Sequence, residues 1–278
     1  MLESIINKNM GIVSNTLFNR KSKCALVPFI TAGYPNLSST IDALHTLDIN
    51  GADIIELGIP YADALADGPV IQESSRVALK QGVNVDQVIS MLKVVIPCLN
   101  TPIVIFTYYN PVLAKGIESF VYDSAMSGVS GLVIPDLPLE EADYLISLCS
   151  RYSIELILFV APTSSETRIA SIISKSPGCL YLVSSCGVTG IRNQITAKIN
   201  LIADKIKNQT SKAVILGFGI SNSEQISQIL KWNIDGVVIG SFFIKTMFNK
   251  SSLNAVRSLG SLCANFRDTI DQYISLTE

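Results

Sequence analysis

The sequence predicts a single α/β domain over residues 1–278, a (βα)8 TIM barrel with an extra N-terminal helix. Short runs rich in β-branched residues alternate with helical patterns about eight times, which is the repeat of this fold. The runs are apolar at nearly every position, as expected for parallel strands covered on both faces. An open, doubly wound sheet is the alternative, because strands are easily miscounted from one sequence.

The first expected element is an amphipathic helix that ends near Asn19. The eight expected strands are residues 24–33, 53–58, 102–109, 131–137, 155–162, 180–185, 213–219 and 236–241. Residues 69–100 are expected to hold two helices separated at Gly82, and a long helix is expected over about 252–276. Capping boxes, in which a hydroxyl and a later glutamate satisfy backbone amides, indicate two helix starts at Thr163/Glu166 and Ser221/Glu224.

The composition excludes several classes of function. A net charge of −2 provides no basic surface for nucleic acid. The single histidine, His45, lies in a helical pattern, which argues against a catalytic histidine or a two-histidine metal site, so no metal is expected. The six cysteines form no C-x-x-C pair and are expected to be reduced and mostly buried. No apolar stretch is long enough to span a membrane, so we expect a soluble intracellular protein of the cytoplasm or, if organelle-encoded, the plastid stroma.

The stretch IIELGIPYADALADGP (54–69) contains the first candidate catalytic residue. Glu56 interrupts an apolar strand and shares a face with Ile54 and Gly58, which should be the barrel interior. Burial there would raise the pKa of the carboxyl group toward neutrality, and such a group can both donate and accept protons. The alternative is a structural acid paired with a distant lysine or arginine.

Asp67 follows the same strand and is the second candidate. A loop aspartate is commonly a helix cap, but two acids at one end of a barrel can divide the handling of protons between them. The glycines of GFGIS (217–221) and IGS (239–241) end the seventh and eighth strands, where barrels frequently bind phosphate. The long loop SSCGVTGIRNQIT (184–196) is typical of a lid.

Seven segments of the sequence together resemble the tryptophan synthase alpha chain family. In chain order they are PFITAGYP (28–35), ELGIPYADALADGP (56–69), YYNPV (108–112), IPDLPLEE (134–141), LVSSCGVTG (182–190), LGFGIS (216–221) and VVIGS (237–241). The resemblance covers nearly the whole chain and implies a (βα)8 lyase. The implied reaction is retro-aldol cleavage of indole-3-glycerol phosphate to indole and glyceraldehyde 3-phosphate, without a cofactor in this chain.

The resemblance also implies roles for individual residues. Glu56 matches the general acid/base, and Asp67 matches the carboxylate that stabilises the protonated indole. The implied substrate-binding residues are Phe29, Tyr181, Thr189, Gly190, Phe218, Gly219, Gly240 and Ser241. Of these, Thr189 matches the threonine of the lid, and the glycines and serine match amides that bind phosphate.

The family implied by the resemblance works as an α2β2 heterotetramer in which the β chain holds pyridoxal phosphate. Asp63, Asn110 and Pro111 match its partner-facing surface. Ala64 replaces a proline that is usual in the family, which should loosen the loop that carries Asp67. A stand-alone lyase that releases free indole, and a non-catalytic activator of a β chain, are the two alternatives.

Overall fold

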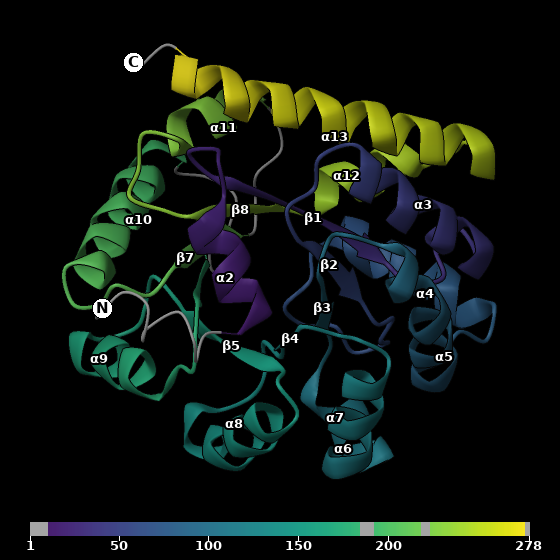
Figure 1. Cartoon of the computed structure of the whole chain (residues 1–278), viewed down its shortest axis with the longest axis horizontal. Helices are drawn as coiled ribbons and strands as arrows, with labels where there is room; N and C mark the ends of the chain where they lie inside the picture. The colour runs from purple at the N-terminus through teal and green to yellow at the C-terminus, as the bar shows by residue number, and fades with distance from the viewer. Residues whose placement is uncertain (1–10, 184–191, 218–222, 276–278) are drawn as a thin grey trace.

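The computed structural model describes residues 11–183, 192–217 and 223–275. Its strands form one closed parallel barrel in which each strand pairs with the next and β8 pairs with β1, with helices around the outside (Figure 1). The strands are β1 (Ala25–Thr31), β2 (Ile55–Gly58), β3 (Ile103–Phe106), β4 (Gly131–Val133), β5 (Glu155–Val160), β6 (Leu180–Val183), β7 (Val214–Gly217) and β8 (Gly236–Ile239). The predicted barrel is confirmed, and the alternative of an open sheet is wrong.

Helices follow the strands along the chain. They are α2 (Ile12–Asn19), α3 (Leu37–Ile49), α4 (Pro69–Lys80), α5 (Val85–Val95), α6 (Tyr109–Lys115), α7 (Ile117–Met126), α8 (Ala142–Arg151), α9 (Glu166–Lys175), α10 (Arg192–Lys207), α11 (Ser223–Ile229), α12 (Ser241–Met247) and α13 (Ser252–Ser275). Short 3-10 turns precede β3 and α8 at Ile96–Cys98 and Leu139–Glu141. The N-terminal helix, the division near Gly82 and the long last helix are confirmed; α13 packs along α3, α11 and α12 (Figure 1).

Several predicted boundaries are wrong. The third strand ends at Phe106, and Tyr109 already begins α6, although Thr107 and Tyr108 between them are residue types that favour strands. Likewise, Ser241 begins α12 rather than ending the last strand. The cap of α9 is Ser165, whose hydroxyl oxygen accepts a hydrogen bond from the Arg168 amide at 3.2 Å, so the predicted Thr163/Glu166 capping box does not form. The second predicted box, at Ser221, lies outside the described residues.

Helix α2 covers the N-terminal end of the barrel. A Cβ atom on Gly131, at the start of β4, would lie 3.0 Å from Val13, and one on Gly236, at the start of β8, would lie 3.3 Å from Leu17. Glu155, only 3% exposed, accepts hydrogen bonds from the Ser14 amide (3.1 Å) and the Ser14 hydroxyl (2.6 Å). This buried carboxylate therefore fixes the helix to the bottom of the barrel and leaves the opposite end for a functional site.

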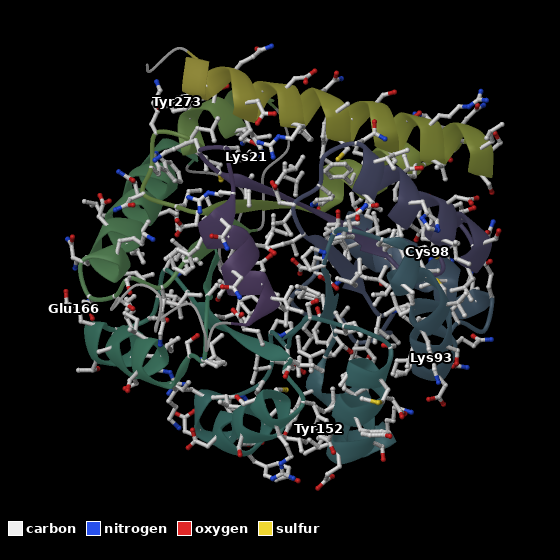
Figure 2. All side chains as sticks on the ribbon, viewed as in Figure 1. Lys21, Lys93, Cys98, Tyr152, Glu166 and Tyr273 are labelled. Atoms are coloured by element: carbon white, nitrogen blue, oxygen red, sulfur yellow. The ribbon has the colours of Figure 1, made fainter. Side chains whose placement is uncertain are left out.

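The cysteines of the described residues are free thiols, as predicted. Four of them are buried, at positions 24, 149, 179 and 263, whereas Cys98 is exposed on the outer surface (Figure 2). Cys186 lies outside the described residues. In the described part of the chain, no helix combines the length and apolar character needed to cross a membrane.

Candidate active site

Glu56 lies inside the barrel. It pairs in register with Phe29 on β1 and with Val104 on β3, and it is 2% exposed. Phe29 and Phe106, on strands that are not neighbours, have ring centroids 5.6 Å apart, so their side chains meet within the barrel. A Cβ atom on Gly58, which shares the face of Glu56, would lie 2.5 Å from the Phe29 ring. Glu56 therefore opens onto an interior packed with aromatic rings.

Asp67 lies beyond the end of the same strand, in the loop of residues 61–67. The Tyr108 hydroxyl lies close enough to its carboxylate for hydrogen bonding between them to lower the pKa of Asp67. The same hydroxyl oxygen accepts a hydrogen bond from the Ala66 amide at 3.1 Å. Tyr108 follows β3, so a residue from the neighbouring strand holds the loop that carries Asp67.

The pKa values of Glu56 and Asp67 are both raised, and that of Glu56 is the higher of the two. Burial, and then the nearby charge of Asp67, raises the pKa of Glu56 from 4.5 to about 8. Burial also raises the pKa of Asp67, from 3.8 to about 6, although the hydrogen bond from Tyr108 opposes this rise. Near neutral pH, Glu56 is therefore protonated while Asp67 is ionised. A proton donor and an anion lie at the same end of the barrel, an arrangement suited to acid/base chemistry on a substrate that becomes cationic.

Tyr181 lies close to both acids. It is 2% exposed on β6, and burial together with the charges of Glu56 and Asp67 raises the pKa of its hydroxyl. Its ring centroid is 4.7 Å from that of Phe159. A Cβ atom on Gly217 would lie 2.1 Å from the Tyr181 hydroxyl oxygen, so only glycine fits at the end of β7.

The expected phosphate-binding residues are only partly described. Gly240 precedes α12, and Ser241 is its first residue. A Cβ atom on Gly240 would lie 3.3 Å from Ile71 and 3.4 Å from Phe29, which places this strand end beside the aromatic interior. The remaining expected binding residues lie outside the described residues: Thr189, Gly190, Phe218 and Gly219.

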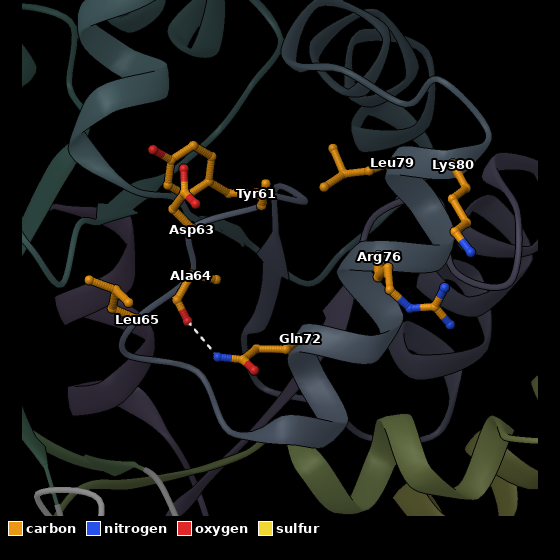
Figure 3. Close-up of a pocket in the computed structure, with 9 residues that line it drawn as sticks. Tyr61, Asp63, Ala64, Leu65, Gln72, Arg76, Leu79 and Lys80 are labelled. Atoms are coloured by element: carbon orange, nitrogen blue, oxygen red, sulfur yellow. Dashed lines mark hydrogen bonds between the residues drawn. The ribbon is translucent and has the colours of Figure 1, made fainter.

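The expected partner-facing residues lie on the outside of the same end. Asp63 and Asn110 are exposed, Pro111 is half-buried, and Leu65 is 92% exposed. A pocket of about 590 Å³ lies between the loop of residues 61–65 and helix α4, whose Gln72, Arg76, Leu79 and Lys80 line it (Figure 3). Neither Glu56 nor Asp67 lines this pocket, so it is separate from the two acids.

Tyr108 is the residue that the sequence analysis did not select. It belongs to the YYNPV segment, where only Asn110 and Pro111 received a role. An aromatic residue after an apolar strand reads as core, and Tyr108 is indeed 3% exposed. Its position at the same barrel end as Asp67 was the available signal. Within the described part of the chain, no group of three histidine, cysteine or acidic residues could hold a metal ion.

Comparison with known proteins identifies the family. The family model described as "Tryptophan synthase alpha chain" matches residues 16–271. The chain belongs to this family. A tryptophan synthase alpha chain from Gracilaria tenuistipitata var. liui is 57% identical over 261 residues, which cover 94% of this chain and 97% of the relative.

Solved structures of the tryptophan synthase family have the same fold. The alpha subunit from Legionella pneumophila superposes with a TM-score of 0.84 at 30% identity, covering 95% of this chain and 99% of that one. A chain of the tryptophan synthase a2b2 complex from Pyrococcus furiosus superposes with a TM-score of 0.81 at 34% identity, covering 88% and 98%. The resemblance drawn from the seven sequence segments is thereby confirmed.

Proposed function

We propose that Glu56 and Asp67 carry out the carbon–carbon lyase reaction of the tryptophan synthase alpha chain family in this protein. The substrate is indole-3-glycerol phosphate, and the products are indole and glyceraldehyde 3-phosphate, in the last steps of tryptophan biosynthesis. The observation that carries this assignment is the pair of acids at one end of the barrel, one with a pKa of about 8 and the other of about 6.

The proposed reaction begins with protonation of the indole ring. Glu56 donates its proton to C3, which leaves the ring nitrogen cationic, and the ionised Asp67 accepts the N–H and stabilises that charge. The bond between C3 and the glycerol carbon then breaks, and its electron pair returns to the ring. The hydroxyl on that carbon loses its proton to Glu56, which is now the base, and becomes the aldehyde.

Phe29, Tyr181 and Phe218 are proposed to enclose the indole and glycerol parts of the substrate. Burial of Phe29 and Tyr181 beside Glu56 supports this for the two that the structure describes. Backbone amides are proposed to bind the phosphate at Gly190, Gly219, Gly240 and Ser241. Thr189 is proposed to contact Asp67 when the lid loop closes.

The partner is proposed to be a tryptophan synthase β chain in an α2β2 heterotetramer. The similarity to a chain of the Pyrococcus furiosus a2b2 complex supports a β-chain partner. Asp63, Asn110 and Pro111 are proposed to face it. Pyridoxal phosphate would be bound by the β chain, and this chain would need no cofactor. The proposed location is the cytoplasm or, if the chain is organelle-encoded, the plastid stroma.

The test is indole release from indole-3-glycerol phosphate by the purified chain, alone and with a β chain. We expect weak activity alone and a rise of about 10-fold or more with the β chain. Glu56→Gln should lower kcat by roughly 10²- to 10⁴-fold. The matched control is Glu166→Gln, which removes an exposed carboxylate paired with Lys205 and should leave kcat unchanged.

The other outcomes are equally informative. Strong activity alone that a β chain does not change would identify a stand-alone lyase that releases free indole. Stimulation of the β chain without any lyase activity would identify a non-catalytic activator. Full activity in Glu56→Gln would refute the assignment of Glu56.

A further inference from the structure

A continuous set of contacts joins the exposed Asn110 to the buried side of Asp67. The Asn110 side-chain amide donates a hydrogen bond to the Tyr61 hydroxyl at 3.2 Å. The rings of Tyr61 and Tyr108 lie against each other, with centroids 5.3 Å apart and planes inclined by 32°. The Tyr108 hydroxyl in turn accepts a hydrogen bond from the Ala66 amide at 3.1 Å, and it lies beside the carboxylate of the next residue, Asp67, whose pKa it lowers.

We propose that Tyr61 and Tyr108 are positioning residues for the lyase reaction, through which a partner bound at Asn110 acts on the Asp67 carboxylate. This proposal rests on the proposed function. It concerns how Asp67 is held and how the partner reaches it, neither of which follows from the presence of the two acids.

The hydroxyl of Tyr108 joins the backbone of the loop to the Asp67 carboxylate. Its oxygen accepts a hydrogen bond from the Ala66 amide, and its proton remains to donate to the neighbouring carboxylate, whose pKa it lowers. A carboxylate accepts several hydrogen bonds, so Asp67 keeps free lone pairs for an N–H of the substrate. The loss of the Tyr108 hydroxyl would therefore leave Asp67 in the site with less restraint on its position.

Tyr61 restrains the ring of Tyr108. It is half-buried at the start of the loop of residues 61–67, and its ring covers that of Tyr108. Phenylalanine would supply the same ring contact, but without the hydroxyl there is no hydrogen bond to Asn110. The hydroxyl oxygen of Tyr61 therefore links the loop after β2 to the start of α6, which follows β3.

The side chain of Asn110 is accessible to a partner chain. It is exposed in the first turn of α6. The preceding residue, Tyr109, is anchored because its amide donates to the Asp136 carboxylate at 2.8 Å. A partner that competes for the Asn110 amide, or reorients it, would thus move the Tyr61 hydroxyl rather than the whole turn.

The experiment compares single hydroxyl deletions in the full chain. Tyr61→Phe and Tyr108→Phe are assayed for kcat and KM, alone and with a β chain, over a range of pH. Tyr144→Phe is the matched control, since its hydroxyl also donates to a carboxylate, that of Glu118, on the outer helices. Far-UV and near-UV circular dichroism of each variant checks that the fold is retained.

We expect Tyr108→Phe to lower kcat by about 3- to 10-fold, the effect of one lost hydrogen bond, with little change in KM. The acidic limb of the kcat/KM pH profile of this variant should move to higher pH, because the hydrogen bond from Tyr108 opposes the rise of the Asp67 pKa. Tyr61→Phe should reduce the stimulation by the β chain by a similar factor while β-chain affinity stays within about 2-fold. In the Tyr61→Phe/Tyr108→Phe double variant, the Tyr61 effect should disappear.

Additive effects in the double variant, or variants that match Tyr144→Phe in kcat, pH profile and stimulation, would overturn the proposal. These results are distinguishable from failure of the proposed function. In that case the unmodified chain would release no indole, or Glu56→Gln would remain active, whatever the tyrosine variants do.

Discussion

The buried Glu56 should make the stability of this protein depend on pH in a predictable direction. Its pKa is raised from 4.5 to about 8 by burial and by the charge of Asp67. Between these two values the folded protein retains a proton that the unfolded chain has lost, so stability falls as pH rises. Each pH unit in this range costs about 1.4 kcal/mol. The cost is therefore about 3 kcal/mol at neutral pH and approaches about 5 kcal/mol well above pH 8.

Glu56→Gln removes this cost, because an amide of nearly the same shape carries no charge. We expect the stability advantage of the variant over the parent to rise from about 1 kcal/mol near pH 5 to about 3 kcal/mol near pH 7 and about 4 kcal/mol near pH 8. Near neutral pH that corresponds to a melting temperature roughly 6 to 12 °C higher for a chain of this length. Calorimetry of both proteins across the pH range measures the difference directly.

The control, Glu73→Gln, should change stability in the opposite direction to Glu56→Gln. The pKa of Glu73 is lowered by its hydrogen bond and ion pair with Arg76, so its stabilising contribution is present at neutral pH and is lost in acid. Glu73→Gln should therefore be less stable than the parent at neutral pH and equal to it in acid. If the difference between Glu56→Gln and the parent does not change with pH, the pKa of Glu56 is the same in the folded and unfolded chain, and the acid/base role fails with it.

Two further predictions concern the same acids and the bottom of the barrel. Lyase activity should be greatest between about pH 6 and about pH 8, where Asp67 is ionised and Glu56 protonated; a bell-shaped pH profile of kcat/KM, which reports the acid and base of the free enzyme, checks this. Glu155→Gln, which places an amide group against the Ser14 and Cys179 amides, should lower the free energy of unfolding by about 1 to 3 kcal/mol in denaturant titrations while kcat is retained.

The sequence was sufficient to predict the barrel because each parallel strand is apolar on both faces. It was less able to predict where strands end. No proline or charged residue separates Tyr109 or Ser241 from the strand before it, but the chain has left the hydrogen-bonded ladder and begins α6 and α12 at these residues. Each of these helices has only 7 residues, too few to show a helical period. Whether these short helices form depends on their contacts with neighbouring strands, and the pattern of residues along the sequence does not show those contacts.

Site residues could be predicted from the sequence where a charged residue interrupts or directly follows an apolar strand. They could not be predicted where the residue is itself typical of a core. Glu56 is conspicuous because a buried charge is costly, and Asp67 because it follows the same strand. Tyr108 is apolar enough to read as core, and its importance arises only when β2 and β3 lie side by side. Tyr61 is missed for the same reason, since its contacts are with residues about 50 positions away in the chain.

The loop that carries Asp67 is held more firmly than its sequence suggests. Ala64 stands where the family usually has proline, which led us to expect a looser loop. Yet the Ala64 side chain is 3% exposed, and its carbonyl accepts hydrogen bonds from the Gln72 side chain (Figure 3) and the Asp67 amide, both at 3.1 Å. Tyr108 holds the next part of the loop through the Ala66 amide. These hydrogen bonds restrain the conformation of the loop, as a proline would by fixing its backbone dihedral angle.

Restoring the proline therefore tests whether the loop is loose or held. In a held loop, Ala64→Pro acts mainly on the unfolded chain, so it should add about 0.4 to 1 kcal/mol of stability and change kcat less than about 2-fold. Gln72→Ala removes one of the holding contacts and should reduce kcat more than Ala64→Pro alters it, an effect of about 2- to 10-fold. Steady-state assays and denaturant titrations of both variants give the comparison. A large gain in kcat from Ala64→Pro, with no effect of Gln72→Ala, would mean that the loop is loose and that neither Gln72 nor Tyr108 restrains Asp67.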